Sequence, residues 1–290
     1  MFSSFNARAV GLATLSAGAT IDLAAGAGFD GVDLMVRDLV RQGDDPASIR
    51  SRLVDRGLKA GAFPLPMDWR GDESAFRRDL ADLPRLAAAA ETLGLARTAT
   101  WVMPEAPDRL ADRREVAALH VHRIGAIARI LGDHGVRLGL EVIGVESSRI
   151  GRGEPFVTRM ADLDRELGAI WAEAANLDLL VDAFHLHAAG EPVDAALAWG
   201  VDRVVWVHVA DLPPGLSPLD RSRIVDAERG LPGENGAVDV RGVLARLAAE
   251  GYGGPVTAEP LARCASLMGL EPGAIARRVK ASLDSAWPGR

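Results

Sequence analysis

The chain has almost none of the residues that two common kinds of chemistry require. It contains one cysteine, Cys264, so no internal disulfide can form, and we expect a reducing, cytoplasmic compartment. Lysine occurs only as Lys59 and Lys280. Lys59 would begin a strand, at the wrong end of a barrel, and Lys280 lies in a C-terminal helix. This scarcity argues against lysine-dependent aldolase and pyridoxal-phosphate chemistry.

The sequence also lacks long apolar runs and an excess of basic residues. No uninterrupted apolar run reaches the roughly 18–20 residues of a membrane-spanning helix, and the best candidate, Leu86–Ala96, is broken by Glu91 and Thr92. The opening MFSSFNARAV has no basic region followed by an apolar core, so we expect no signal peptide. The formal net charge of −7 disfavours nucleic acid, whose phosphates favour a basic face. We therefore expect neither a membrane nor a nucleic acid as partner.

Strand-like and helix-like segments alternate along the chain, with no linker or change of composition that would divide it. Repeated strand–helix units predict a parallel sheet, and eight of them predict a closed (β/α)₈ TIM barrel of the α/β class. We expect a single domain over residues 1–290, since such barrels need roughly 250 residues plus insertions. The expected strands are Val10–Leu15, Gly31–Val36, Leu58–Phe63, Ala96–Val102, Val136–Ile143, Leu177–Asp182, Arg203–Val209 and Pro255–Glu259. The expected helices are Ile21–Gly26, Pro46–Arg56, Glu73–Leu93, Asp108–Asp133, Val157–Ala175, Pro192–Trp199, Val240–Glu250 and Pro272–Ala286.

Turn-forming residues mark several boundaries between these elements. Asp45-Pro46 is typical of a helix start, with an aspartate N-cap before a proline in the first turn. The longest irregular stretch, Leu212–Ala237, lies between the seventh and eighth strands. On a barrel it would lie over the C-terminal mouth, where we expect it to form part of the substrate pocket as a movable cover. Glycine, the favoured helix C-cap, ends several expected helices, at Gly28, Gly57, Gly94, Gly135 and Gly251.

Four residues of metal-binding type stand at the ends of short apolar runs. Because side chains alternate along a strand, we expect Glu141, His208 and Glu259 to face inward and the three valines of Val205–Val209 to face outer helices. If the strands are neighbours in a barrel, their ends converge. Two glutamates, an aspartate and a histidine form a hard ligand set that suits Mn²⁺, Mg²⁺ or Co²⁺, and Zn²⁺ less exclusively. The runs are Val136–Glu141, Leu177–Asp182, Val204–His208 and Gly254–Glu259.

Six longer segments carry a resemblance to a known family. They are GFDGVDL (Gly28–Leu34), LGLEVIG (Leu138–Gly144), LLVDAFHLH (Leu179–His187), VHVADLP (Val207–Pro213), RGLPGENGAVD (Arg229–Asp239) and GYGGPVTAEP (Gly251–Pro260). In this order they resemble the sugar isomerase/epimerase family of xylose-isomerase-like TIM barrels. The Asp-Ala-Phe-His-x-His and Arg-x-x-Pro-Gly-x-x-Gly pieces are most similar to inosose isomerases. The same frame carries isomerases, epimerases, dehydratases and DNA-repair nucleases, so the resemblance specifies fold and metal set more closely than substrate.

The resemblance implies one divalent metal ion, with Mn²⁺ as the first choice and Mg²⁺, Co²⁺ or Zn²⁺ as alternatives. It would be held by Glu141, Asp182, His208 and Glu259. The resemblance further implies that Glu141 and Glu259 are catalytic and move protons at the substrate carbon, without showing which one is the base. His185 is implied as a catalytic and substrate-binding residue that contacts substrate oxygens.

The chain departs from related ketose epimerases after the seventh strand. Those enzymes carry an arginine a few residues past the strand-seven histidine, whereas Asp211–Gly215 contains none. An arginine from the long loop could replace it as a substrate-binding residue, and Arg229 is the first choice because the family has a similar arginine there. The alternative is that Arg229 ties the loop to the barrel rim. The other candidates in this loop are Arg221 and Arg223.

Two further residues, Trp101 and Asp211, have two interpretations each, and a third, Trp69, has one. Trp101, at the end of the fourth strand, either lines the substrate pocket as a binding residue or packs in the core. Trp69 could cover the barrel mouth from the third loop. Asp211 either orients the imidazole of His208 or is a solvated loop aspartate.

These observations lead to an expected function. Taking a proton from beside a carbonyl creates an enediolate, whose charge a metal stabilises while positioned acids and bases transfer the proton. We expect a divalent-metal-dependent isomerase or epimerase of a small polyhydroxy ketone, an inosose or keto-sugar, in carbohydrate metabolism such as inositol catabolism. The alternative is a metal-dependent dehydratase of an inosose or 3-dehydroshikimate, which needs an acid for the departing hydroxyl. A homo-oligomer is compatible with the sequence.

Two other classes are disfavoured. A three-zinc nuclease would need many histidines, and the first four expected strand ends offer none. A non-catalytic sugar-binding protein would not require both Glu141 and Glu259 beside Asp182 and His208.

Overall fold

The strands of the described residues form one parallel sheet. The computed structural model describes residues 1–106, 112–149, 153–217 and 221–289. Its strands are β1 (Phe2–Phe5), β2 (Gly31–Val32), β3 (Lys59–Ala60), β4 (Phe63–Pro64), β5 (Arg97–Trp101), β6 (Arg137–Glu141), β7 (Leu177–Asp182), β8 (Val204–Val209) and β9 (Pro255–Ala258). Their order in the sheet is β3-β2-β1-β9-β8-β7-β6-β5-β4, and each neighbouring pair is parallel.

The barrel closes through one interrupted strand. β3 and β4, the two ends of the sheet order, are consecutive pieces of Lys59–Pro64. On one side the Gly61 N–H donates to the Val32 carbonyl at 2.9 Å. On the other side the Leu65 N–H donates to the Ala99 carbonyl at 2.9 Å. The nine strands therefore occupy eight positions around a barrel, which confirms the predicted (β/α)₈ fold.

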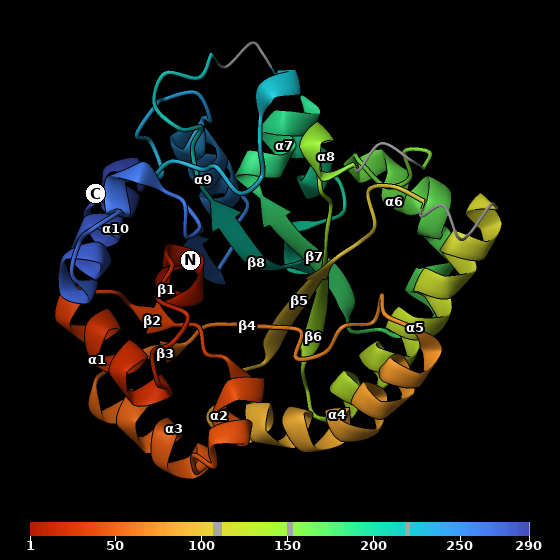
Figure 1. Ribbon diagram of the computed structural model, residues 1–290, viewed down its shortest axis with the longest axis horizontal. Coiled ribbons are helices and arrows are strands. Elements are labelled where there is room, and N and C mark those ends of the chain that lie inside the picture. The colour runs from red at the N-terminus through yellow and green to blue at the C-terminus, as the bar shows by residue number, and fades with distance from the viewer. Residues whose placement is uncertain (107–111, 150–152, 218–220, 290) are drawn as a thin grey trace.

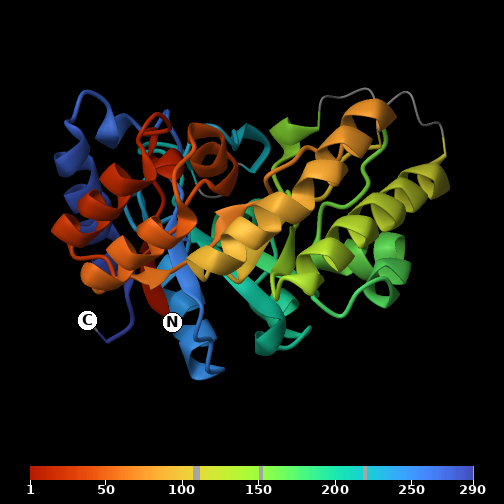
Figure 2. The same ribbon diagram turned by 90° about the horizontal axis from the view of Figure 1, so that it is seen from below.

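Helices surround the strands as an outer ring (Figure 1). Turning the molecule shows the N-terminus at the lower end of the barrel (Figure 2). No described helix is long and apolar enough to cross a membrane. The helices are α1 (Ala17–Ala27), α2 (Val36–Gln42), α3 (Pro46–Asp55), α4 (Glu73–Leu93), α5 (Arg113–Asp133), α6 (Met160–Leu167), α7 (Ala183–Ala189), α8 (Asp194–Leu197), α9 (Val240–Ala249) and α10 (Pro272–Ala286).

Helix caps follow the predicted residues. The Asp45 side chain accepts hydrogen bonds from the backbone N–H groups of Ala47 and Ser48 and so caps α3, whose first residue is Pro46. The five predicted glycines all have positive φ, the conformation that an L-residue resists at a helix end. Gly94, for example, has φ 76° and its N–H donates to carbonyls of the last turn of α4.

The prediction of the first strand was wrong. Val10–Leu15 is not a strand, and β1 lies nearer the N-terminus at Phe2–Phe5. Its two central residues are serines, so this strand is not an apolar run. Both hydroxyls are buried and paired, because Ser3 donates to Asp30 at 2.7 Å and Ser4 donates to Asp33 at 2.6 Å.

Other boundaries differ because short helices fill the loops after strands. The predicted strand Gly31–Val36 ends at Val32, and α2 and α7, of seven residues each, were missed. The predicted helix Val157–Ala175 begins at Met160 and tightens into a 3₁₀-helix at Gly168–Ala172. Of the predicted helix Asp108–Asp133, residues 108–111 lie outside the described part of the chain.

The interior of the barrel holds a small apolar cluster separate from the main core. It consists of Ala62, Ala99, Leu180, Val205 and Trp206. Val205 was predicted to face outward with the other valines of β8. A register shift between β7 and β8 lets it join the inner cluster instead. The main core, between strands and helices, contains the outward residues Val207 and Val209.

We predict that Gly61→Ala destabilises the barrel while Gly26→Ala does not. A methyl group at Gly61 would lie 2.1 Å from Asp33 Oδ1 and 2.4 Å from Ser4 Oγ. Relieving such overpacking typically costs about 1–3 kcal/mol of unfolding free energy. Gly26, within α1, has no atom near its added methyl group. Urea unfolding of both variants checks this, and equal midpoints would show that the strand break tolerates a side chain.

Candidate metal centre

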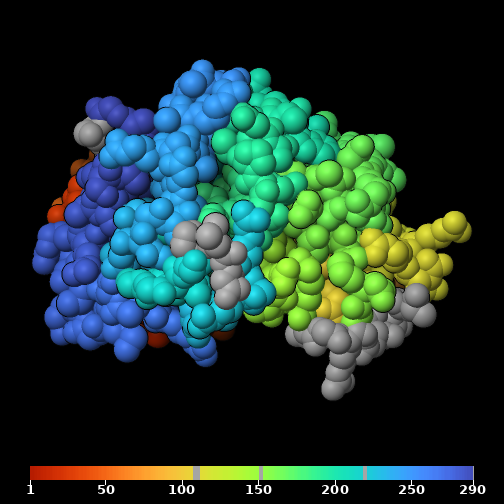
Figure 3. Space-filling model, turned by 90° about the horizontal axis from the view of Figure 1, so that it is seen from above, coloured from red at the N-terminus to blue at the C-terminus, as the bar shows by residue number. Residues whose placement is uncertain are grey.

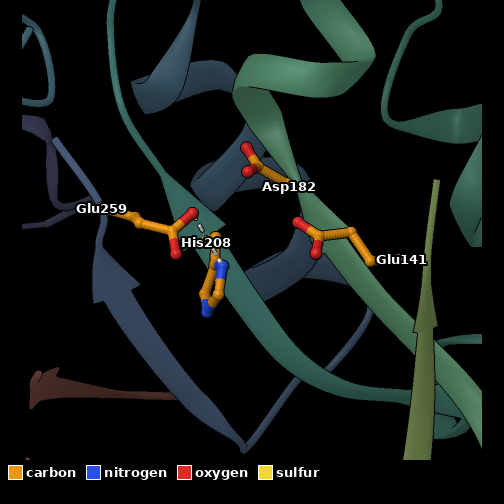
Figure 4. A group of neighbouring side chains, drawn as sticks. All are labelled: Glu141, Asp182, His208 and Glu259. Carbon is orange, nitrogen blue, oxygen red and sulfur yellow. Dashed lines mark ion pairs between the residues drawn. The ribbon is translucent and has the colours of Figure 1, made fainter. Parts of the chain in front are cut away.

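Four side chains from neighbouring strands meet at the C-terminal end of the barrel. Glu141 ends β6, Asp182 ends β7, His208 lies in β8, and Glu259 follows β9. Each contributes one donor atom, and these atoms all lie within 4.8 Å of one another. Figure 4 shows the four side chains directed toward a common centre. The structure therefore brings together the residues that the sequence placed at four strand ends.

The chemistry and spacing of this group fit one divalent metal ion. Two ligands that are each about 2.0–2.4 Å from an ion lie at most about 4.8 Å apart. His208 is buried, and neither of its ring nitrogens has an aligned hydrogen bond within the described residues, although Nδ1 stands 3.2 Å from Glu259 Oε2. Leaving a buried imidazole without partners is costly. A metal bond to one ring nitrogen would satisfy this group.

The local structure after β7 aims one oxygen of Asp182 at the centre. Asp182 is both the last residue of the strand and the N-cap of α7. Its Oδ1 accepts hydrogen bonds from the N–H groups of Phe184 at 2.7 Å and His185 at 3.4 Å. These bonds fix the orientation of the carboxylate, and its Oδ2 accepts no hydrogen bond from α7.

Burial and mutual charge shift the acid–base properties of the cluster. Burial, together with the charges of Asp182 and Glu259, raises the pKa of Glu141 well above its usual range. Burial alone would raise the pKa of Asp182, but Arg229 and two histidines outweigh it and lower this pKa to about 2. Burial alone would lower the pKa of His208, but the charges of Glu259 and its neighbouring carboxylates raise it to about 9. Asp182 and Glu259, whose pKa is also lowered by His208 and Arg229 against the effect of burial, are thus the carboxylates most favoured in their charged form.

Arg229 and His185 lie against the ligands rather than in open space. Arg229 Nη1 donates to Asp182 Oδ2 at 2.8 Å and to Glu259 Oε2 at 3.0 Å. Its Nη2 lies 3.1 Å from His185 Nε2. Since a guanidinium only donates, His185 Nε2 accepts and the ring is neutral, in keeping with the pKa of His185, which burial lowers. Both side chains are buried, so their predicted contact with substrate stays a prediction.

A cavity of about 360 Å³ adjoins the centre. Glu141, His208 and Glu259 line it, so three of the four cluster residues are exposed to it. Trp101 lines it as well and is 39% exposed, and its ring stacks on the guanidinium of Arg70 at 3.8 Å. The volume lies within the roughly 300–1,000 Å³ of small-molecule sites. Trp69, by contrast, is fully buried and donates to Thr100, so it does not cover the mouth.

Asp211 organises the long loop, and among the described residues its side chain makes no hydrogen bond to His208. Its buried carboxylate accepts hydrogen bonds from five backbone N–H groups, at Leu212, Asn235, Gly236, Ala237 and Val238. Its own backbone pairs with Gly230. The loop's described residues, cyan to blue in Figure 3, form part of the molecular surface between the green middle and the blue end of the chain. Residues 218–220 of the predicted cover lie outside the described residues.

Comparison with known proteins places the chain in a family. Residues 21–285 match the family described as the xylose isomerase-like TIM barrel. The chain belongs to this family. The fold and the resemblance read from the sequence are therefore confirmed.

Curated relatives of this xylose isomerase-like protein catalyse two kinds of reaction. It is 29% identical over 255 residues to a 3-dehydroshikimate dehydratase of Pseudomonas aeruginosa, a match that covers 86% of this chain but 37% of the relative. It is 22% identical over 191 residues to an inosose isomerase of Bacillus velezensis, covering 65% of this chain and 61% of the relative. The chain thus spans little more than a third of the dehydratase and less than two thirds of the isomerase.

Solved structures of similar proteins share the whole barrel. A xylose isomerase domain protein of Alicyclobacillus acidocaldarius superposes with a TM-score of 0.82 at 27% identity, covering 99% of this chain and 98% of that one. The IolI protein, solved with a bound zinc atom, has a TM-score of 0.78 at 16% identity, with coverage of 99% and 98%. At this identity the second likeness shows the fold alone.

Sequence reasoning missed several residues of the site. Arg8, after β1, and Asn6 line the cavity but stand in a segment that was predicted to precede the first strand. Arg70, stacked on Trp101, lies in the third loop and had no sequence signal beyond its proximity to Trp69. Correct placement of β1 would have put Asn6 and Arg8 at a strand end, beside the metal ligands.

We predict that Asp211→Asn loosens the long loop. The substituted amide would turn one hydrogen-bond donor toward N–H groups that now share a carboxylate, and unsatisfied buried donors cost about 1–3 kcal/mol each. Limited proteolysis should then cut within 212–238, with a lower thermal midpoint. Asp239→Asn is the control, because asparagine caps a helix such as α9 equally well. Equal proteolysis of both variants would contradict the role given to Asp211.

Proposed function

We propose that the protein is a divalent-metal-dependent isomerase or epimerase of a small polyhydroxy ketone, such as an inosose or a keto-sugar. The observation that carries this proposal is that Glu141 and Glu259 line the same cavity, beside the candidate metal centre. Two carboxylates on one cavity can take a proton from a substrate carbon and return it elsewhere. The inosose isomerase among the relatives supports the proposal.

In the proposed reaction all four residues of the centre hold the metal, and two of them also move protons. Glu141, Asp182, His208 and Glu259 would hold the metal. When bound, a divalent ion would supply Lewis-acid stabilisation of the negative charge that develops on the substrate oxygens. Mn²⁺ remains the first choice for this ion, because most of the four donor atoms are oxygens. Glu141 and Glu259 also have faces on the cavity, so either can serve as the proton acceptor.

Trp101 and His185 complete the proposed site in different ways. The ring of Trp101 offers an apolar wall against which the carbon face of a polyol can pack. His185 Nε2 lies 3.9 Å from Glu141 Oε1 and 3.8 Å from Asp182 Oδ2. From this place it could contact a substrate oxygen or assist proton transfer at Glu141 after a small side-chain movement.

A second candidate function is the dehydration of 3-dehydroshikimate. The 29% identity to the Pseudomonas aeruginosa dehydratase over most of this chain favours it. This substrate has a carboxylate, which inososes lack. Arg8 lines the cavity and could pair with such a group.

The experiment is a substrate panel in D₂O with added Mn²⁺. Inososes, ketohexoses and 3-dehydroshikimate would be followed by mass spectrometry. An isomerase or epimerase gives products of unchanged composition with solvent deuterium at the carbon beside the carbonyl. A product lighter by one water, from 3-dehydroshikimate only, would replace the first function by the second.

We predict that Glu141→Gln and Glu259→Gln each slow turnover and deuterium exchange by about 10²–10⁴-fold at saturating Mn²⁺. Each change removes a proton acceptor from the cavity while keeping its size. Glu250→Gln, at an exposed site at the end of α9, is the matched control and should leave both rates unchanged. Wild-type exchange in the Glu141→Gln/Glu259→Gln double variant, with its metal bound, would exclude the proton-transfer role.

A further inference from the structure

The negative charges of the candidate metal centre outnumber the positive charges of a divalent ion. Three carboxylates contribute three negative charges, and His208 is neutral when a ring nitrogen binds a metal. A divalent ion supplies two positive charges. One negative charge is therefore left over among these four residues, beside the buried Asp182, where an uncompensated charge is costly. Asp226 also contacts Arg229, but its side chain is 39% exposed and water screens its charge.

Arg229 stands where it can balance that charge. Its Nη1 bridges two ligands from different strands, with 2.8 Å to Asp182 Oδ2 and 3.0 Å to Glu259 Oε2. The side chain is 2% exposed. Arg229 is absent from the residues that line the cavity beside the centre.

The surrounding structure holds the guanidinium in this position. Asp226 accepts a hydrogen bond from Nη2 at 2.6 Å on its side chain and another from Nε at 3.0 Å on its carbonyl. The ring of Phe184 packs on the guanidinium at 4.4 Å. The next residue, Gly230, pairs with Asp211, and a methyl group there would lie 2.6 Å from the Leu212 carbonyl. The close packing of the backbone at Gly230 against that at Leu212 thus places Arg229 beside the centre.

We propose that Arg229 is the resident counter-cation of the metal centre: its guanidinium balances the third carboxylate and makes the centre selective for divalent over trivalent ions. In this role it is a positioning residue that acts through Asp182 and Glu259. The inference rests on the metal site of the proposed function. Its test measures ion binding directly, so it can fail while an isomerase activity is found, and the reverse.

The test compares two ions of similar size and different charge, Mn²⁺ and Lu³⁺, by titration calorimetry of the metal-free protein in phosphate-free buffer. A loss of ligand positioning weakens both ions. A loss of one positive charge beside the site favours the trivalent ion more than the divalent one, because Coulomb energy scales with ion charge. The ratio of the two affinities therefore separates charge from geometry.

For Arg229→Gln we expect the ratio of Lu³⁺ to Mn²⁺ affinity to rise about ten-fold or more over wild type. Arg229→Lys keeps the charge without the fork of donors, so its ratio should stay near wild type even if both ions bind more weakly. Arg85→Gln is the matched control, since it removes an arginine that pairs with Asp82 on the exposed side of α4, and its ratio should stay at the wild-type value.

Two results would overturn the proposal. One is an unchanged ratio in Arg229→Gln, which would leave Arg229 a purely structural residue. The other is an equal rise in Arg229→Lys, which would assign the effect to geometry. If Arg229→Gln does not fold, Asp226→Asn is measured in its place. This change removes the negative charge that pairs with Arg229, so the ratio of Lu³⁺ to Mn²⁺ affinity should fall below the wild-type value.

Discussion

Repulsion among three closely spaced carboxylates is the constraint that the rest of the site satisfies. Glu141, Asp182 and Glu259 present oxygens within 4.8 Å of one another, and although Glu141 and Glu259 are partly exposed to the cavity, Asp182 is buried. Backbone N–H groups of α7, the imidazole of His208 and the guanidinium of Arg229 all converge on these oxygens. The parallel strands of the barrel keep the members of this group from separating.

The parallel barrel supplies that rigidity through register. Asp182 pairs with His208 across β7 and β8, and His208 pairs with Thr257 across β8 and β9. Beneath the centre, Thr257 donates to Asp33 at 2.7 Å and accepts from the indole of Trp206 at 2.9 Å. Such a bonded layer of inward side chains fixes the height of the metal ligands. The long loop adds a further anchor, since Asp211, three residues beyond His208, holds the backbone that carries Arg229.

The overall architecture could be predicted from the sequence, because it follows from the alternation of strand-like and helix-like segments and from the positions of polar residues at strand ends. Eight alternating units predict a barrel, and ligand types at four strand ends predict a common centre, as the structure and the family match bear out for the fold. Three features of the structure could not be predicted from the sequence. The paired serines of β1 do not look like a strand, the shift that turns Val205 inward depends on its neighbour β7, and the contacts of Asp211 and Arg229 join residues far apart in the chain. Each depends on tertiary partners that no local pattern encodes.

Metal binding by the four strand-end residues is the claim on which the account depends. The most direct measurement is an anomalous-difference map from crystals of the Mn²⁺-loaded protein, collected at the manganese edge. We expect one peak, with Glu141, Asp182, His208 and Glu259 each placing a donor atom about 2.0–2.4 Å from it. A peak elsewhere, a second peak of equal height, or two of these side chains turned away from the ion would contradict it.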